Sequence, residues 1–337
     1  MPQTFHTIVF QAAPGGGNPC PFTLYADALS SEDMQAMAKA FGEESAFLLT
    51  PTLNGCDIRA RYFVPLHEME MCVHATIAST TVLAQKDIFT HSPIIFETVL
   101  GAIPVYWKEK SNDPDQSLNS ANQSTCTKNG CIEQTKSSKV SPIKVSIEQF
   151  LPKFANNNPS LEEACCALAI TADDIGDGPI QSVATSRFKL IVPLKDRCVL
   201  DALKPDFKYL WDLCDRYQTT GFYPFTKEEL PLKTTTITDA NEQSTPRTTS
   251  VFFARQFPKR AGYPEDPATG VAASALGAYL AHHAIISTKE EWNAYPIYQG
   301  QAMNRPSLIY SEIKRENGFI AKTRVTGSVH ILNQWLP

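Results

Sequence analysis

The stretch Arg59-Ala-Arg-Tyr-Phe-Val-Pro-Leu-His-Glu-Met-Glu-Met-Cys-Val-His-Ala-Thr76 decides the fold that this chain is expected to adopt. Residues 58, 60, 62 and 64 are apolar or aromatic and alternate with their neighbours, which predicts a strand, and Pro65 ends it because proline has no N–H to donate. Residues 74–84 are small or apolar and predict a helix. Cys72 and His74 would then lie at a helix N-terminus, which favours anions. The alternative is a buried loop with a hydrogen-bonded imidazole and an inert thiol.

A second stretch, residues 251–282, repeats this plan. It contains an aromatic-rich strand around Arg255 and Phe257, a proline stop, a loop with acidic residues and a helix of small residues. Its pair Ala268-Thr269 matches the pair Ala75-Thr76 of the first stretch. Self-similarity across this distance predicts two related halves, each with its own helix N-terminus. Two facing N-termini would form a cleft between domains, the usual place for a small-molecule site.

Length and composition indicate a globular protein. The 337 residues suffice for two domains, and 43% hydrophobic and 19% charged residues are ordinary values. A net charge of −5 without a basic stripe argues against nucleic-acid binding. The sequence has no apolar run of membrane length and no signal peptide pattern. The nine cysteines are scattered without zinc-ligand spacing, so we expect reduced thiols in a cytoplasmic protein and no metal.

The polar tract at residues 111–141 divides the chain. It is rich in Ser, Asn, Gln, Thr and Lys, which predicts an insertion or a long surface loop. We expect a first domain at residues 1–147 and a second at residues 148–337, whose last strand packs on the first domain. Many short strands with one apolar helix in each half favour an α+β fold over a doubly wound parallel sheet.

Two carboxylates, Glu43 and Glu44, precede a predicted buried strand at residues 46–49. A carboxylate pressed against an apolar strand has a raised proton affinity and can act as an acid or base near neutral pH. The alternative is one exposed turn residue and one cap or salt-bridge partner. The sequence pattern alone does not choose between these interpretations.

Six blocks of the sequence together resemble the PhzF-like family, the phenazine-biosynthesis-type isomerases on the diaminopimelate-epimerase fold. Their order and spacing match the family pattern across the chain except at residues 111–141. The blocks are Gly17-Asn18-Pro19, Glu44-Ser-Ala-Phe47, Arg61-Tyr-Phe63-Val-Pro65, Cys72-Val-His74-Ala-Thr76, Glu265-Asp266-Pro-Ala-Thr269-Gly270-Val271-Ala272, and Gln299-Gly300 followed by Asn304-Arg305-Pro306-Ser307.

The resemblance implies two pseudo-symmetric domains, each a mostly antiparallel sheet wrapped around a central helix. It also implies a cofactor-free site between them, a small anionic metabolite as substrate and a homodimer. In the family chemistry a Glu moves a proton between carbons of a cyclohexadiene carboxylate. Glu44 matches that residue, and His74 and Asp266 match those that assist it. The implied substrate contacts are Asn18, Cys72, Val73, Ala75, Thr76, Thr269, Gly270 and Val271.

Departures from the family pattern affect the substrate pocket. Val73 stands where glycine is usual, and Val271 replaces a serine hydroxyl. Arg187 and Lys189 add two cations, either for an anionic substrate or on a solvated strand edge. Asn304 also replaces a glycine. The phenazine substrate is therefore not carried over to this chain.

Two other functions remain open beside the isomerase. An epimerase could use Cys72 and a carboxylate on opposite faces of a carbon, because stereoinversion needs one acid and one base. A non-catalytic small-molecule-binding protein could have kept the fold, since fold alone does not give function. The two valines favour the binding protein, whereas Glu44, His74 and Asp266 together favour an enzyme.

Overall fold

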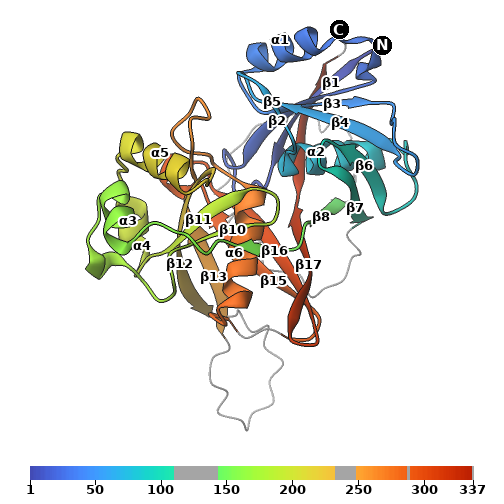
Figure 1. Ribbon diagram of the computed structural model, residues 1–337. Helices are drawn as coiled ribbons and strands as arrows, with labels where there is room; N and C mark the ends of the chain where they lie inside the picture. Colours follow the sequence, from blue (N-terminus) through green and yellow to red (C-terminus); the bar gives the residue numbers. More distant parts are fainter. Residues whose placement is uncertain (110–142, 232–247, 287–288, 336–337) are drawn as a thin grey trace, which may run out of the picture.

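The computed structural model describes residues 1–109, 143–231, 248–286 and 289–335 (Figure 1). The predicted insertion at residues 111–141 lies outside these described residues. Within them, no helix is both long and apolar enough to cross a membrane. The cysteines that the structure describes are all free thiols.

The first half of the chain builds a sheet around one helix. Its elements are β1 (Gln3–Val9), β2 (Asn18–Leu24), α1 (Ser31–Phe41), β3 (Ser45–Leu49), β4 (Ile58–Phe63), β5 (Glu68–Met69), α2 (Val73–Gln85), β6 (Ile94–Thr98) and β7 (Gly101–Glu109).

The second half repeats the arrangement with more helices on its outside. Its elements are β8 (Ile143–Gln149), β9 (Lys153–Phe154), α3 (Leu161–Leu168), β10 (Gln181–Ala184), β11 (Phe188–Pro193), α4 (Arg197–Ala202), α5 (Phe207–Arg216), β12 (Gly221–Pro231), β13 (Thr248–Ala254), β14 (Phe257–Pro258), α6 (Gly270–His282), β15 (Trp292–Gln299), β16 (Ser307–Glu316), β17 (Phe319–Gly327) and β18 (Val329–Trp335).

Strand pairing shows that the two halves are structural repeats. In the first half, β2 pairs in parallel with β3 across α1, and β4 with β6 across α2. In the second, β11 pairs in parallel with β12 across α4 and α5, and β13 with β15 across α6. The other pairings are antiparallel in the part of the chain described here. The predicted α+β fold with two pseudo-symmetric halves is confirmed.

The helices α2 and α6 form the centres of the two halves. Every residue of α2 from Val73 to Ala84 is buried, as is every residue of α6 from Gly270 to Ala281. A helix that is apolar all round belongs in a core, and small side chains let strands approach it from several sides. At Gly277 of α6, an added Cβ would lie 2.0 Å from the Ser311 hydroxyl of β16, so the sheet packs directly on the helix backbone.

The two halves share one hydrogen-bonded sheet. Strand β8 lies between β7 of the first half and β17 of the second. The last strand, β18, returns to pair with β1, so both chain ends lie at the first half (Figure 1). The predicted boundary at residues 147–148 falls within β8, and this division into domains stays a prediction.

Local signals mark both ends of the outer helix α1. Ser30 and Asp33 form a capping box at its start, and Gly42 ends it with a φ of 70°. Met34 and Ala38 of α1 pack against β3 and β4. Because α1 stops at Gly42, residues 43 and 44 form a short connection that delivers Glu44 to the start of β3.

The predicted match between the two repeats is wrong in register. Cys72 is the N-cap of α2, whereas Ala75 and Thr76 lie inside its first turn. The N-cap of α6 is Thr269. By helix position Cys72 therefore corresponds to Thr269, and the Ala-Thr pairs are four residues out of step. Both helices begin in runs of small residues, so the sequence pattern alone could not fix how the two repeats align.

Candidate functional site

The N-terminal ends of α2 and α6 meet at a cavity between the two halves. The cavity has a volume of about 170 Å³, and its wall includes Cys72, Val73 and His74 from the first half and Thr269, Gly270 and Val271 from the second. Among the described residues, neither N-cap side chain hydrogen-bonds to its own helix. First-turn N–H groups are therefore left for a ligand, and they favour a negative one.

Val73 and Gly270 explain how the two helix ends approach so closely. A Cβ placed on Gly270 would lie 2.4 Å from a methyl group of Val73. The valine that replaces the usual glycine at position 73 is thus accommodated by a glycine on the facing helix. The Val73 side chain therefore packs directly on the α6 backbone where the two halves meet.

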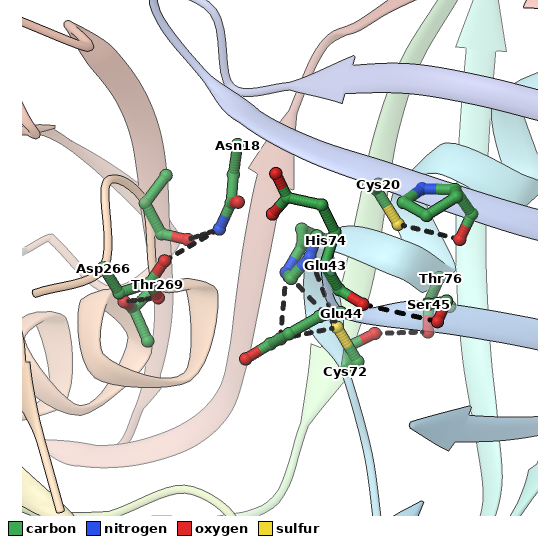
Figure 2. A network of polar contacts seen from close by, with 12 residues as sticks. Asn18, Cys20, Glu43, Glu44, Ser45, Cys72, His74, Thr76, Asp266 and Thr269 are labelled. Carbon is green, nitrogen blue, oxygen red and sulfur yellow. Dashed lines mark hydrogen bonds and ion pairs between the residues drawn. The ribbon is translucent and has the colours of Figure 1, made fainter. Parts of the chain in front are cut away.

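Glu44, Cys72 and His74 form a compact group, called here the acid–thiol–imidazole cluster (Figure 2). The Cys72 thiol donates to Glu44 Oε2 at 3.4 Å and lies 3.2 Å from His74 Nδ1. His74 Nδ1 is 3.7 Å from Glu44 Oε2. From the second half, the Tyr263 hydroxyl donates to Glu44 Oε1 at 2.7 Å. Both oxygens of Glu44 are therefore held by polar neighbours.

The charge states of this cluster follow from burial and contact. Burial opposes ionisation of Glu44, but His74, the Tyr263 hydroxyl and the Cys72 thiol together hold its pKa below the usual value. Burial lowers the pKa of His74, and the negative charge of Glu44 opposes this effect. Burial and then Glu44 raise the pKa of Cys72 well above its ordinary value. The cluster thus presents an ionised Glu44 beside a protonated thiol.

Asp266 lines the same cavity and is held by Asn18 of the first half and Thr269 of the second (Figure 2). Asn18 donates to Asp266 Oδ1 at 2.9 Å, and the Thr269 hydroxyl donates to Oδ2. Burial, followed by repulsion from Glu44, raises the pKa of Asp266 to about 7. Glu44 and Asp266 are therefore pushed toward opposite protonation states, the pattern expected of a catalytic base and acid.

The predicted raised proton affinity holds for only one of the two adjacent glutamates. Burial raises the pKa of Glu43, as expected for a carboxyl near an apolar strand. For Glu44 the expectation is wrong, because hydrogen-bond donors from distant parts of the chain reverse the effect of burial. The carboxyl group of the site whose pKa is raised is that of Asp266, and no pattern in the sequence indicated this shift.

Three of the residues predicted to contact the substrate lie behind the cavity wall and hold other residues in place. Asn18, Ala75 and Thr76 are buried and are not among the described residues that line the cavity. Asn18 holds the Asp266 loop through the carboxylate and through Ala268 O at 2.9 Å. Thr76 bonds to Cys72 O at 2.9 Å and to Tyr62 at 2.6 Å, inside the first half. The remaining predicted site residues line the cavity.

Sequence reasoning missed two residues that shape the site. Tyr263 lies in an irregular loop, and no pattern there indicated a contact with Glu44. Gln299 is fully buried and receives hydrogen bonds from Thr269 N at 3.2 Å and Tyr223 at 2.9 Å. Its amide donates to Asp266 O at 2.6 Å, so it fixes the loop before α6. Gln299 was part of a family block, and that was its only signal.

The acid–thiol–imidazole cluster also has the composition of a metal site. One ligand atom from each of its three residues lies within 4.8 Å of the others. Carboxylate, thiolate and imidazole are all zinc ligands, but a thiol must lose its proton to bind. Because burial raises the pKa of Cys72, this group is unfavourable to thiolate binding as it stands.

The fold belongs to a class in which two pseudo-symmetric halves enclose one cavity. The model of the phenazine biosynthesis-like protein family matches residues 8–333. The chain therefore belongs to this family, PhzC-PhzF, and the predicted family is confirmed.

Known relatives cover almost the whole chain. The isomerase YddE of Escherichia coli K12, itself called uncharacterized, is 30% identical over 98% of this chain and 96% of its own. Trans-2,3-dihydro-3-hydroxyanthranilate isomerase of Pseudomonas aeruginosa is 25% identical over 95% of this chain and 93% of its own. The crystal structure of a Bacillus anthracis PhzF-family protein has a TM-score of 0.75 at 22% identity, covering 99% of this chain and 98% of that one, which shows the shared fold. The comparisons support isomerase activity in general.

Proposed function

We propose that this protein is a cofactor-independent isomerase that moves a proton on a small carboxylate-bearing substrate. Glu44 acts as the base, and the cavity between α2 and α6 holds the substrate. The observation that carries this proposal is a pair of carboxyl groups on the wall of one cavity whose pKa values shift in opposite directions. The pKa of Glu44 is lowered and that of Asp266 is raised to about 7.

In the proposed reaction, the substrate carboxylate lies against the first-turn N–H groups of α2 and α6. Glu44 removes a proton from a carbon next to the conjugated system, and the electron pair of the broken C–H bond moves into that system. The protonated carboxyl of Asp266 and the helix N-termini stabilise the negative charge that develops. Glu44 then returns a proton to another carbon, which restores its carboxylate.

His74 and Cys72 have positioning roles in this scheme. The Cys72 thiol donates to Glu44 Oε2, the same oxygen that faces His74. A protonated thiol is a poor base, and the position on α6 that matches Cys72 is Thr269. Because its thiol stays protonated, Cys72 is disfavoured as the base of an epimerase that pairs it with a carboxylate.

Solvent deuterium exchange tests the proposal. The purified protein is incubated in deuterium oxide with a panel of small cyclic and amino carboxylates, and C–H exchange is followed by NMR. Glu44→Gln should slow exchange by about 10²–10⁴-fold, because it removes the base. Cys72→Ser should keep most of the activity.

Two results would change the assignment. Loss of exchange in Cys72→Ser with activity retained in Glu44→Gln would support the epimerase instead. Ligand binding without exchange by the wild-type protein would support the non-catalytic binding protein. The homodimer and the cytoplasmic location stay predictions, and sedimentation of the purified protein would test the first.

A further inference from the structure

Lys189 and Gln256 line the cavity but have no part in the proposed proton transfer. Lys189 lies on β11, whose side chains alternate between two cores. Leu190 and Val192 pack with the outer helices α4 and α5, whereas Ile191 belongs to the core around α6. Strand alternation therefore places Lys189 on the α6 side, at the end of β11 that opens into the cavity.

Lys189 carries a buried amine that has no acidic partner in the described part of the chain. It is 5% exposed, and its ammonium donates to Thr220 O at 3.3 Å. Among the residues that the structure describes, it has no carboxylate within ion-pair distance. Two other cations of the cavity wall, Lys259 and Arg260, both pair with Asp215. A buried amine without an acidic partner favours its neutral form, and an anion bound beside it would stabilise the charged form.

Gln256 supplies a second, independent observation at the same place. It is 1% exposed, and in the described structure neither its Nε2 nor its Oε1 has a hydrogen-bond partner. Its amide packs on Gly221, where an added Cβ would lie 2.6 Å from Nε2. Gly221 follows Thr220, whose carbonyl accepts from Lys189. The Gln256 amide and the Lys189 amine thus contact two adjacent residues, Gly221 and Thr220.

Arg187 adds positive charge at the rim. Its guanidinium is 4.0 Å from Glu70, and its side chain is 35% exposed. Burial, followed by repulsion from Arg187, lowers the pKa of Lys189 to about 7, while Asp266, Cys214 and Glu44 act in the opposite direction. An anion bound next to Lys189 would therefore draw a proton onto its amine, because opposite charge favours the charged form.

From these contacts we propose that the substrate is a small dicarboxylate. Its first carboxylate lies at the N-termini of α2 and α6, and its second is bound by Lys189 and the Gln256 amide. This inference rests on the proposed function, which already places one carboxylate at the helix ends. A carboxylate has two oxygens, so one accepts from the ammonium and the other from the amide N–H. The cavity of about 170 Å³ is smaller than pockets for drug-sized ligands, about 300–1,000 Å³, which limits the substrate to a small molecule.

Binding to a catalytically silent protein tests this subsite separately from the chemistry. Calorimetry on Glu44→Gln would compare succinate, glutarate, adipate and cyclohexene dicarboxylates, each paired with its monoamide. At least one dicarboxylate should bind about tenfold or more tightly than its monoamide, since charge-assisted hydrogen bonds are lost in the amide. Adding Lys189→Met should remove this preference, and adding Gln256→Met should reduce it. Lys204→Met, at an exposed lysine between α4 and α5, is the matched control and should leave it unchanged.

The outcomes separate the two proposals. Equal affinity within every pair, including no measurable binding of either member, overturns the dicarboxylate subsite. A preference that survives both Lys189→Met and Gln256→Met overturns it as well, provided that both variants unfold at the wild-type temperature. Failure of Glu44→Gln to slow deuterium exchange would refute the proposed reaction, and it would leave the measured dicarboxylate preference intact.

Discussion

Replacing Tyr263 with phenylalanine should move the acid limb of the pH–rate profile to higher pH. The Tyr263 hydroxyl donates to Glu44 Oε1 at 2.7 Å and helps to hold the pKa of Glu44 down. Removing the donor weakens the ionised form more than the protonated form, so the pKa of Glu44 must rise. The base is then protonated over a wider range of acidic pH, and the rate is lost earlier as pH falls.

The size of the shift follows from the strength of the hydrogen bond. A hydrogen bond to a charged group contributes about 1.5–3 kcal/mol, and one pKa unit corresponds to about 1.4 kcal/mol. The Tyr263→Phe variant should therefore raise the acid-limb pKa by about one to two units. The rate at the pH optimum should change much less, because the carboxylate itself remains.

The assay is kcat/KM for deuterium exchange as a function of pH, which reports the groups of the free enzyme. Tyr217→Phe is the matched control, because the Tyr217 hydroxyl donates to Glu163 Oε2 at 2.8 Å outside the cavity. An acid limb that stays in place in Tyr263→Phe would refute the assignment of Glu44 as the base. An equal shift in the control would show that the effect is not local.

Other predictions concern the acid, the helix ends and metal dependence. Asp266→Asn should remove the decline of kcat above pH 7 at saturating substrate and leave part of the activity. The pKa of Asp266 is about 7, whereas the amide stays neutral and can still donate. A decline of kcat above pH 7 that persists in this variant would contradict the role of Asp266. Gly270→Ala should lower the free energy of unfolding by about 1–3 kcal/mol through overpacking, since its Cβ would lie 2.4 Å from Val73. Urea denaturation measures this loss, and adding Val73→Ala should recover most of it. Chelator treatment should leave deuterium exchange unchanged, whereas a loss that added zinc restores would assign a metal to the acid–thiol–imidazole cluster.

The sequence by itself determined the local structure around the site. The capping box at Ser30 and the glycine that ends α1 are satisfied within one turn of helix, so neighbouring residues suffice to specify them. The small-residue runs of α2 and α6 identified two core helices, because a helix without a polar face has to be buried. The repeat of strand, proline, loop and helix likewise indicated two related halves.

Only the tertiary structure decided which groups meet in the cavity and in which charge state. Tyr263 reaches Glu44 across 219 residues of sequence, and Asn18 reaches Asp266 across 248. Such contacts depend on how the two halves dock, and no local pattern specifies them. The same docking sets the two pKa shifts. Burial and Glu44 raise the pKa of Asp266, whereas His74, Tyr263 and Cys72 overcome the effect of burial on Glu44 and lower its pKa. The sequence indicated that Lys189 lies on a strand. Only the tertiary packing shows that its side chain is buried and lines the cavity.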